Sequence, residues 1–305
     1  MSINKKLLQV LSALLILIFH VWMPLTNAAV SQYILKTGYI GVDIFFFLAA
    51  YSLADKKIVY SDFIQNRFTK IYLKFLLFTI LAALYQKWSI TRVCKIIFGI
   101  EFFVKGGGSF LWFIPAIMIF YLIYPFYLKL NESFRAAFGL LAWMVLTTVL
   151  EKIFGYTSIF IFLNRIPVII AGDWFKRNKL PGIVYAFLIP TGIFLLYEFG
   201  FKVKLNAPIA ELYYAAGLPL VIGLAWLSGF VKGSKALDIL GGCTLELYAL
   251  QVIFGTVISR TVYGMVGGKL AANLITAAVL WLAAIVLSKG GSIINDNRHS
   301  IRSAE

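Results

Sequence analysis

Apolar residues of this chain gather into blocks of about 20 residues, separated by short polar stretches. A helix of that length spans the hydrocarbon core of a bilayer, which is about 30 Å thick. Because backbone amides inside lipid must be hydrogen-bonded within their own segment, the blocks are predicted to be helices. The candidate spans lie at about residues 7–26, 38–55, 68–88, 110–129, 134–152, 156–172, 180–200, 209–230, 237–259 and 268–288.

The pattern therefore predicts an all-α, polytopic membrane protein with about ten transmembrane helices. We expect residues 1–290 to form a single transmembrane domain and residues 291–305 to form a short cytoplasmic tail. If loops are assigned to alternate sides, 17 lysines and arginines fall on the side of the N-terminus and 10 on the other, with Arg165 inside a span. Since cytoplasmic loops carry the excess of positive charge, both termini are predicted to be cytoplasmic in a multi-pass protein of the cytoplasmic membrane.

The composition argues against several other classes of protein. Hydrophobic residues make up 61% of the chain and charged residues 13%, and the mean hydropathy is +0.88. The net charge is +15, but the basic residues lie at the ends of apolar blocks, where they meet lipid headgroups. Membrane lipid is therefore an expected partner and nucleic acid is not. Cys94 and Cys243 lack the spacing of metal ligands, and we expect no metal.

Four ionisable residues stand out inside predicted spans: His20, Asp43, Arg165 and Glu246. Such groups cost about 2.5–3.5 kcal/mol each on insertion scales, so each is a candidate for function. At a rise of about 1.5 Å per residue, His20 and Asp43 are expected at similar depths in the outer half of the membrane. Arg165 and Glu246 are expected nearer the midplane.

A His beside an Asp supports general base catalysis, because the carboxylate fixes the tautomer and stabilises the imidazolium. His20 and Asp43 could form such a pair. Two other interpretations remain open: His20 as a buried histidine bonded to a backbone carbonyl, and Asp43 as the counter-ion of Arg165. Arg165 needs an anionic partner, and Glu246 is a further candidate for that role.

A cluster of basic residues follows the second span on the predicted cytoplasmic side, and it consists of Lys56, Lys57, Arg67, Lys70 and Lys74. Such a cluster could bind the phosphates of a nucleotide-like cofactor. It could equally be an ordinary topology signal.

Several stretches together resemble the membrane acyltransferase-3 family of O-acyltransferases. They are Leu-Ile-Phe-His at 17–20, Gly-Val-Asp-Ile-Phe-Phe-Phe-Leu-Ala-Ala-Tyr at 41–51, Phe63 and Arg67 with Lys-Ile-Tyr at 70–72, Leu-Trp-Phe-Ile at 111–114 with Tyr121 and Pro125, Arg-Ile-Pro at 165–167 with Gly172, and Leu-Gly at 240–241 with Thr-Leu-Glu-Leu-Tyr at 244–248. They occur in the family's order between about residues 7 and 290.

The resemblance implies an enzyme that takes an acyl group, most often acetyl, from acyl-coenzyme A on the cytoplasmic side. It delivers that group to a hydroxyl of a cell-envelope glycan or polysaccharide at the outer face. The implied catalytic residues are His20, Asp43 and Arg165, with His20 as base or acyl relay. The implied donor-binding residues are Arg67, Lys70 and Tyr121, and the implied acceptor-binding residues are Trp112, Glu246 and Tyr248.

The chain departs from the family pattern at three places. The first-helix arginine of the family is replaced by Gln9 or a neighbour, the second basic residue of the cytoplasmic motif is Lys70, and the last motif has Gln251 where a His is common. The first departure removes a group expected to act on the donor.

Two other functions fit the same spans and buried charges. One is a transporter or flippase for a glycan or lipid-linked substrate. The other is an acyltransferase-like protein that has lost catalysis and assembles with proteins of envelope biosynthesis. A requirement for a CoA thioester would separate the first from an acyltransferase, and loss of function on changing His20 would argue against the second.

Overall fold

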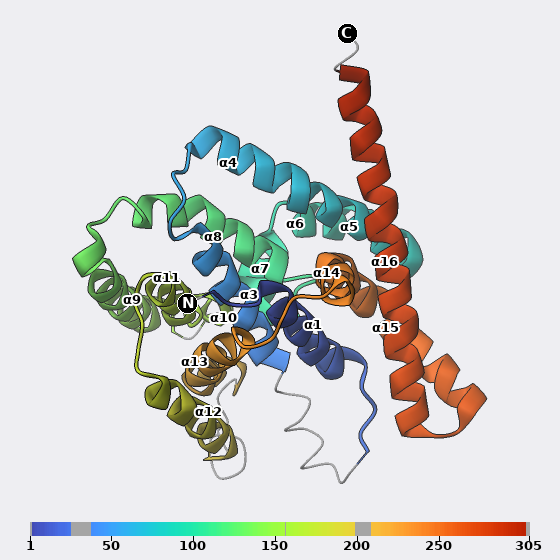
Figure 1. Cartoon of the computed structure of the whole chain (residues 1–305). Coiled ribbons are helices and arrows are strands. Elements are labelled where there is room, and N and C mark those ends of the chain that lie inside the picture. Colours follow the sequence, from blue (N-terminus) through green and yellow to red (C-terminus); the bar gives the residue numbers. More distant parts are fainter. Residues whose placement is uncertain (1, 26–37, 156, 199–208, 303–305) are drawn as a thin grey trace. The chain divides into compact units, whose positions relative to one another are not determined.

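The computed structural model describes residues 2–25, 38–155, 157–198 and 209–302. These residues form helices joined by short connections, and no strand occurs among them (Figure 1). The prediction of an all-α protein is therefore confirmed.

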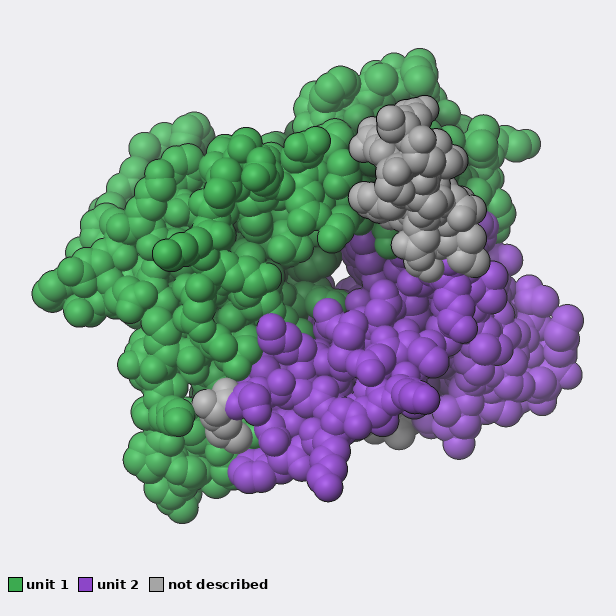
Figure 2. All heavy atoms as spheres, turned by 45° about the horizontal axis from the view of Figure 1, so that its top comes forward, with its two compact units in different colours: residues 1, 42–226 green, residues 2–41, 227–305 purple. Residues whose placement is uncertain are grey.

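The chain divides into two compact units, which are coloured separately in Figure 2. Unit 1 comprises residues 42–226, and unit 2 comprises residues 2–41 together with residues 227–305. The boundaries fall inside two helices, α3 (Gly38–Leu53) and α13 (Ile209–Ser228).

Unit 1 contains most of α3 and α13 and all the helices between them. These are α4 (Tyr60–Arg67), the π-helical turn η1 (Phe68–Tyr72), α5 (Leu73–Gln86), α6 (Ile90–Ile97), α7 (Ile100–Lys105), the 3-10 turn η2 (Gly106–Gly108), α8 (Phe113–Tyr127), α9 (Glu132–Phe154), α10 (Phe160–Leu163), α11 (Ile166–Arg177) and α12 (Gly182–Tyr197).

Unit 2 contains α1 (Lys5–Val21), α14 (Lys235–Gly242), α15 (Thr244–Val266) and α16 (Lys269–Arg302). The side chain of Asn4 caps α1 by accepting a hydrogen bond from the Leu7 amide at 3.0 Å. The other end of α1 is tied to α15, because the hydroxyl of Ser259 donates to the Val21 carbonyl at 3.2 Å. These contacts fix the position of the last turn of α1, which carries His20.

Within the described residues, four helices are long and apolar enough to cross a membrane: Tyr60–Gln86, Glu132–Phe154, Thr244–Val266 and Lys269–Gly290. Shorter apolar helices occur at Gly38–Leu53, Phe113–Tyr127, Gly182–Leu196 and Ala215–Ser228. The protein is thus a membrane protein by its apolar helices, and the number of ten spans and the side of the termini stay predictions.

Three predicted spans differ from the helices observed. The span at 68–88 belongs to a helix that begins at Tyr60, so Arg67, which precedes the predicted span, is helical as well. The span at 156–172 is divided into α10 and α11, and the span at 237–259 into α14 and α15. The hydrophobic periodicity and the length of an apolar block do not show such breaks, because the apolar pattern continues through them.

Aromatic side chains fill the interior of unit 1. The ring of Phe46 on α3 lies 6.4 Å from that of Phe120 on α8 and 5.9 Å from that of Phe162 on α10. Gly172 lets α11 approach the α3 backbone, because a Cβ there would clash with the carbonyl of Phe47. This close approach brings the start of α11 beside the first half of α3, where two predicted site residues lie.

Candidate active site

A buried ion pair joins α3 and α11 in unit 1. The side chains of Asp43 and Arg165 are both fully buried, and Asp43 Oδ1 lies 3.3 Å from Arg165 Nε. Arg165 Nη1 also donates to the carbonyl of Ile161 at 2.7 Å. The indole ring of Trp112 lies 5.7 Å from the guanidinium carbon of Arg165. The counter-ion interpretation of Asp43 is therefore confirmed, and three predicted site residues form one cluster.

The sequence around Arg165 explains why a charged residue occurs here. Pro167 lies in the first turn of α11, and in a continuous helix its ring would clash with the carbonyl of Leu163. The helix therefore stops after Leu163 and resumes at Ile166, which leaves Arg165 at the break. A guanidinium at this position can donate to a carbonyl that the break leaves without a helical partner, and its other N–H groups can still donate to other acceptors.

Gly217 on α13 presses against the same ion pair. A Cβ at Gly217 would clash with Oδ2 of Asp43, so only glycine allows α13 to lie this close to the carboxylate. We expect Gly217→Ala to lower the free energy of unfolding by about 1–3 kcal/mol, as overpacking of a core does.

The measurement for Gly217→Ala is thermal unfolding of the purified protein in detergent. Gly264→Ala on α15 is the control, because a Cβ there meets nothing within 4 Å. In a helix interior this control is expected to be neutral or stabilising by about 0.5–1 kcal/mol. Equal effects of the two substitutions would contradict the packing described for Gly217.

A second cluster in unit 1 surrounds Arg67. Its guanidinium carbon lies 5.1 Å from the ring of Phe63 and 5.0 Å from that of Tyr121, so cation–π contacts hold the side chain between α4 and α8. The Nε atom of Arg67 is buried and makes no hydrogen bond with the described residues. Lys70 lies one turn further on in η1 and is exposed. Arg67 thus keeps a donor available for an anion.

The remaining predicted site residues lie in unit 2. His20, half-buried in the last turn of α1, has its ring 5.0 Å from that of Phe19 and 6.4 Å from that of Tyr248 on α15. Glu246 is buried in the first turn of α15, where a carboxylate also interacts favourably with the helix dipole. His20 and Asp43 belong to different units, so their pairing stays a prediction.

The residues that replace expected basic groups are also placed in unit 2. The side-chain oxygen of Gln9 lies against Gly241 of α14, where an added Cβ would be 3.3 Å away. Gln251 is buried in α15, and its side-chain oxygen accepts no hydrogen bond from the described residues.

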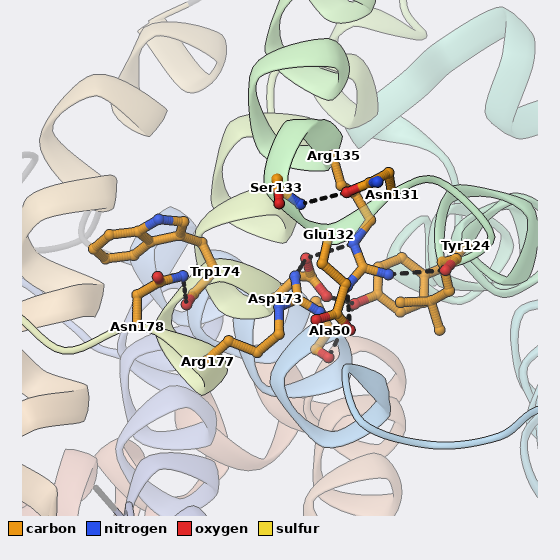
Figure 3. Close-up of polar contacts among 11 residues, drawn as sticks. Ala50, Tyr124, Asn131, Glu132, Ser133, Arg135, Asp173, Trp174, Arg177 and Asn178 are labelled. Carbon is orange, nitrogen blue, oxygen red and sulfur yellow. Dashed lines mark hydrogen bonds and ion pairs between the residues drawn. The ribbon is translucent and has the colours of Figure 1, made fainter.

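The structure adds one polar cluster that the sequence did not single out, around Asp173 of α11 (Figure 3). Asp173 is fully buried and is hydrogen-bonded by Arg177, and Arg135 Nε of α9 lies 3.4 Å from its Oδ2. The hydroxyl of Tyr124 lies 3.1 Å from Asp173 Oδ1 and 3.2 Å from the carbonyl of Ala50.

The charge state of this cluster follows from its surroundings. Burial raises the pKa of the Asp173 carboxyl to about 6, although the charge of Arg135 lowers it. The ion pairs with Arg135 and Arg177 favour the ionised carboxylate. The sequence did contain a signal, since Asp173 and Arg177 are four residues apart on a helix, a spacing that favours an ion pair.

Comparison with family models identifies a domain that covers most of the chain. A family model described as an acyltransferase domain matches residues 6–294. That range includes every candidate site residue, from His20 to Tyr248. No curated protein and no solved structure matches the chain.

Proposed function

Because the chain belongs to the membrane acyltransferase-3 family, we propose that it is an O-acetyltransferase, which transfers acetyl from cytoplasmic acetyl-CoA to a hydroxyl of a cell-envelope glycan. The family match over residues 6–294 is the observation that supports acyltransferase activity. The donor, the acceptor and a location in the cytoplasmic membrane are our extension of it. They are supported by the motifs of the sequence and by the apolar helices.

In this proposal His20 acts as the base. It takes the proton of the acceptor hydroxyl, whose oxygen then forms the ester bond with the acyl carbon. The bond between that carbon and the thioester sulfur breaks, and the proton passes from the imidazolium to the departing thiolate. The half-buried ring of His20 packs on Phe19 and lies near Tyr248, and these aromatic contacts hold the ring in place.

Arg165 is proposed to stabilise the negative charge that develops on the thioester oxygen, a term that is usually large in acyl transfer. Its burial supports this role, because a fixed guanidinium in a dry site needs no reorganisation during the reaction. Asp43 then acts through Arg165 as a positioning residue. Trp112 contacts the same guanidinium, and Glu246 and Tyr248 are proposed to contact the acceptor.

Arg67, Lys70 and Tyr121 are proposed to bind the phosphates of the donor. The buried Nε atom of Arg67, which has no hydrogen-bond partner among the described residues, fits an anionic group. We expect Arg67→Lys to raise the KM for acetyl-CoA about tenfold with a smaller change in kcat, because lysine cannot bind bidentately.

Initial rates over a range of acetyl-CoA concentrations would measure the Arg67→Lys effect. Lys57→Gln removes an exposed cation of the same basic cluster and is the control, for which an unchanged KM is expected. The same increase for both variants would show that only the overall charge of the cluster matters, and would contradict a specific contact by Arg67.

The proposed activity is tested by deleting the gene in its native background and measuring base-labile acetate in each purified envelope glycan. We expect one glycan fraction to lose acetate in the deletion strain and to regain it on complementation, and that fraction identifies the acceptor. Unchanged acetate in every fraction would contradict O-acetylation.

One structural observation favours a second candidate, a transporter. The breaks at α10/α11 and α14/α15 resemble the discontinuous helices that line transport sites. A transporter needs no CoA thioester, and this requirement distinguishes the two functions.

A further inference from the structure

An apolar cavity of about 420 Å³ lies within unit 1, between α8, α9, α10 and α11. Its volume is in the range of ligand-binding pockets, about 300–1,000 Å³. Its walls are almost entirely apolar and include Phe138, Trp143, Phe162 and Ile166. The active-site proposal makes no use of this cavity.

The cavity opens toward a surface that is predicted to face lipid. None of residues 140–154, the greater part of α9, is buried. Among the side chains that line the cavity, Ile123, Phe126, Phe138 and Leu146 are exposed. A bilayer presents hydrocarbon chains to such a surface, so the ligand with direct access is a lipid chain.

The polar cluster around Asp173 adjoins this cavity. Two of the residues that line the cavity contact the cluster: Tyr124 through its hydroxyl on Asp173, and Tyr127, whose ring lies 5.6 Å from the guanidinium carbon of Arg135. Arg135 is one helical turn before Gly139, which also lines the cavity. A ligand that fills the cavity can therefore reach the cluster with a polar end.

The cluster retains capacity to bind an anion. Arg135 is only 2% exposed, and its Nη1 donates to the Leu128 carbonyl at 2.9 Å. Its Nε and Nη2 atoms, and Nη1 of Arg177, are buried and make no hydrogen bond with the described residues. Arg135 Nε lies 3.4 Å from Asp173, and Arg135 Nη2 lies 3.6 Å from Glu132. The Glu132 carboxylate is 72% exposed, so solvent weakens its ion pair with Arg135.

We propose that unit 1 binds one anionic phospholipid, with an acyl chain in the cavity and the phosphate at Arg135 and Arg177. Two arginines opposite one buried carboxylate complement a phosphate, which accepts several charge-assisted hydrogen bonds. The end of α8, the start of α9 and the end of α11 meet at the cluster, and all three are predicted to lie on the cytoplasmic side, where lipid headgroups occur. This proposal does not depend on acyl transfer.

Trp143 supplies the readout, because its indole lines the cavity. The protein is reconstituted in phosphatidylcholine vesicles that contain increasing fractions of phosphatidylglycerol with brominated chains, which quench nearby tryptophan. The difference in quenching between the chain and its Trp143→Phe variant reports bromine near Trp143, which is in the cavity or at its opening. We expect this quenching difference to saturate at a low fraction of brominated phosphatidylglycerol. When phosphatidylcholine carries the bromine instead, saturation should require a much higher fraction of the brominated lipid.

Two variants test the two halves of the site. Arg177→Gln is expected to raise the fraction of phosphatidylglycerol at half-quenching about tenfold, as loss of a charge-assisted hydrogen bond does, and to leave the response to brominated phosphatidylcholine unchanged. Ala142→Phe fills part of the cavity and is expected to reduce the response to both lipids. Lys152→Gln, an exposed cation at the other end of α9, is the matched control and should change neither.

Equal quenching by the two lipids, or an Arg177→Gln variant with an unchanged preference, would overturn the proposal. So would displacement of phosphatidylglycerol by micromolar long-chain acyl-CoA, since that result would make the site a donor site. If Arg177→Gln does not fold, as judged by elution in size-exclusion chromatography, the lipid preference of the wild type and the response of Ala142→Phe still decide the question.

Discussion

Replacing His20 by alanine is expected to lower acyl transfer by at least about a hundredfold, the contribution of a positioned general base. The measured quantity is base-labile acetate on the acceptor glycan, normalised to the amount of protein in the membrane. Stability should change little, because the half-buried His20 ring makes mainly aromatic contacts. The effect should therefore appear in activity and not in protein level.

The chain provides a matched control for this experiment. It contains two histidines, and the second, His299, lies beyond the predicted transmembrane domain. His299→Ala should retain full activity. If His20→Ala retains normal acetate at a normal protein level, His20 is not the base, and the interpretation of His20 as a structural histidine gains support.

Breaking the buried pair at Asp43 and Arg165 is expected to have the largest effect on stability. Asp43→Asn leaves a buried guanidinium without its counter-ion, and Arg165→Met leaves a buried carboxylate. Removal of one partner from such a pair typically destabilises a protein by about 3–5 kcal/mol. The double variant carries no buried charge at this place, and we expect it to regain a large part of that stability, as read from thermal unfolding in detergent.

Activity of the same double variant separates catalysis from structure. If Arg165 stabilises the thioester oxygen, the double variant should fold and yet remain inactive. Recovery of both stability and acetate transfer would contradict a catalytic role for Arg165. The Asp43→Asn variant should lose activity for two reasons only. Less of the protein is folded, and Arg165 is no longer held in position.

Much of the fold could be predicted from the sequence, because the physical cause is local. Apolar blocks of membrane-spanning length become helices whatever their neighbours are, and every predicted span overlaps at least one helix, although several extend past its ends. Buried charges in such blocks could also be recognised, and Asp43 and Arg165 do lie together in the interior. The alternatives for their roles could not be separated, because pairing depends on which helices pack side by side.

The breaks in the helices show where the sequence was insufficient. Pro167 could have indicated that a helix begins near Arg165, but the apolar residues on both sides suggested one continuous span. Arg135 is the second residue of the predicted span 134–152 and Arg177 follows the span 156–172, and basic residues at the ends of apolar blocks ordinarily indicate only topology. The structure shows that Arg135 is buried against Asp173, a contact that joins residues from two helices and is visible only in three dimensions.

The most direct test of the central claim uses inverted membrane vesicles that contain this chain and its native glycans. Acetyl-CoA labelled in the acetyl group is added to the outside, which corresponds to the cytoplasmic face. We expect alkali-labile label to accumulate on glycan in vesicles with the wild-type chain, and vesicles with His20→Ala to accumulate no more than vesicles without the chain. Label that accumulates equally in all three would contradict an acyltransferase that uses acetyl-CoA.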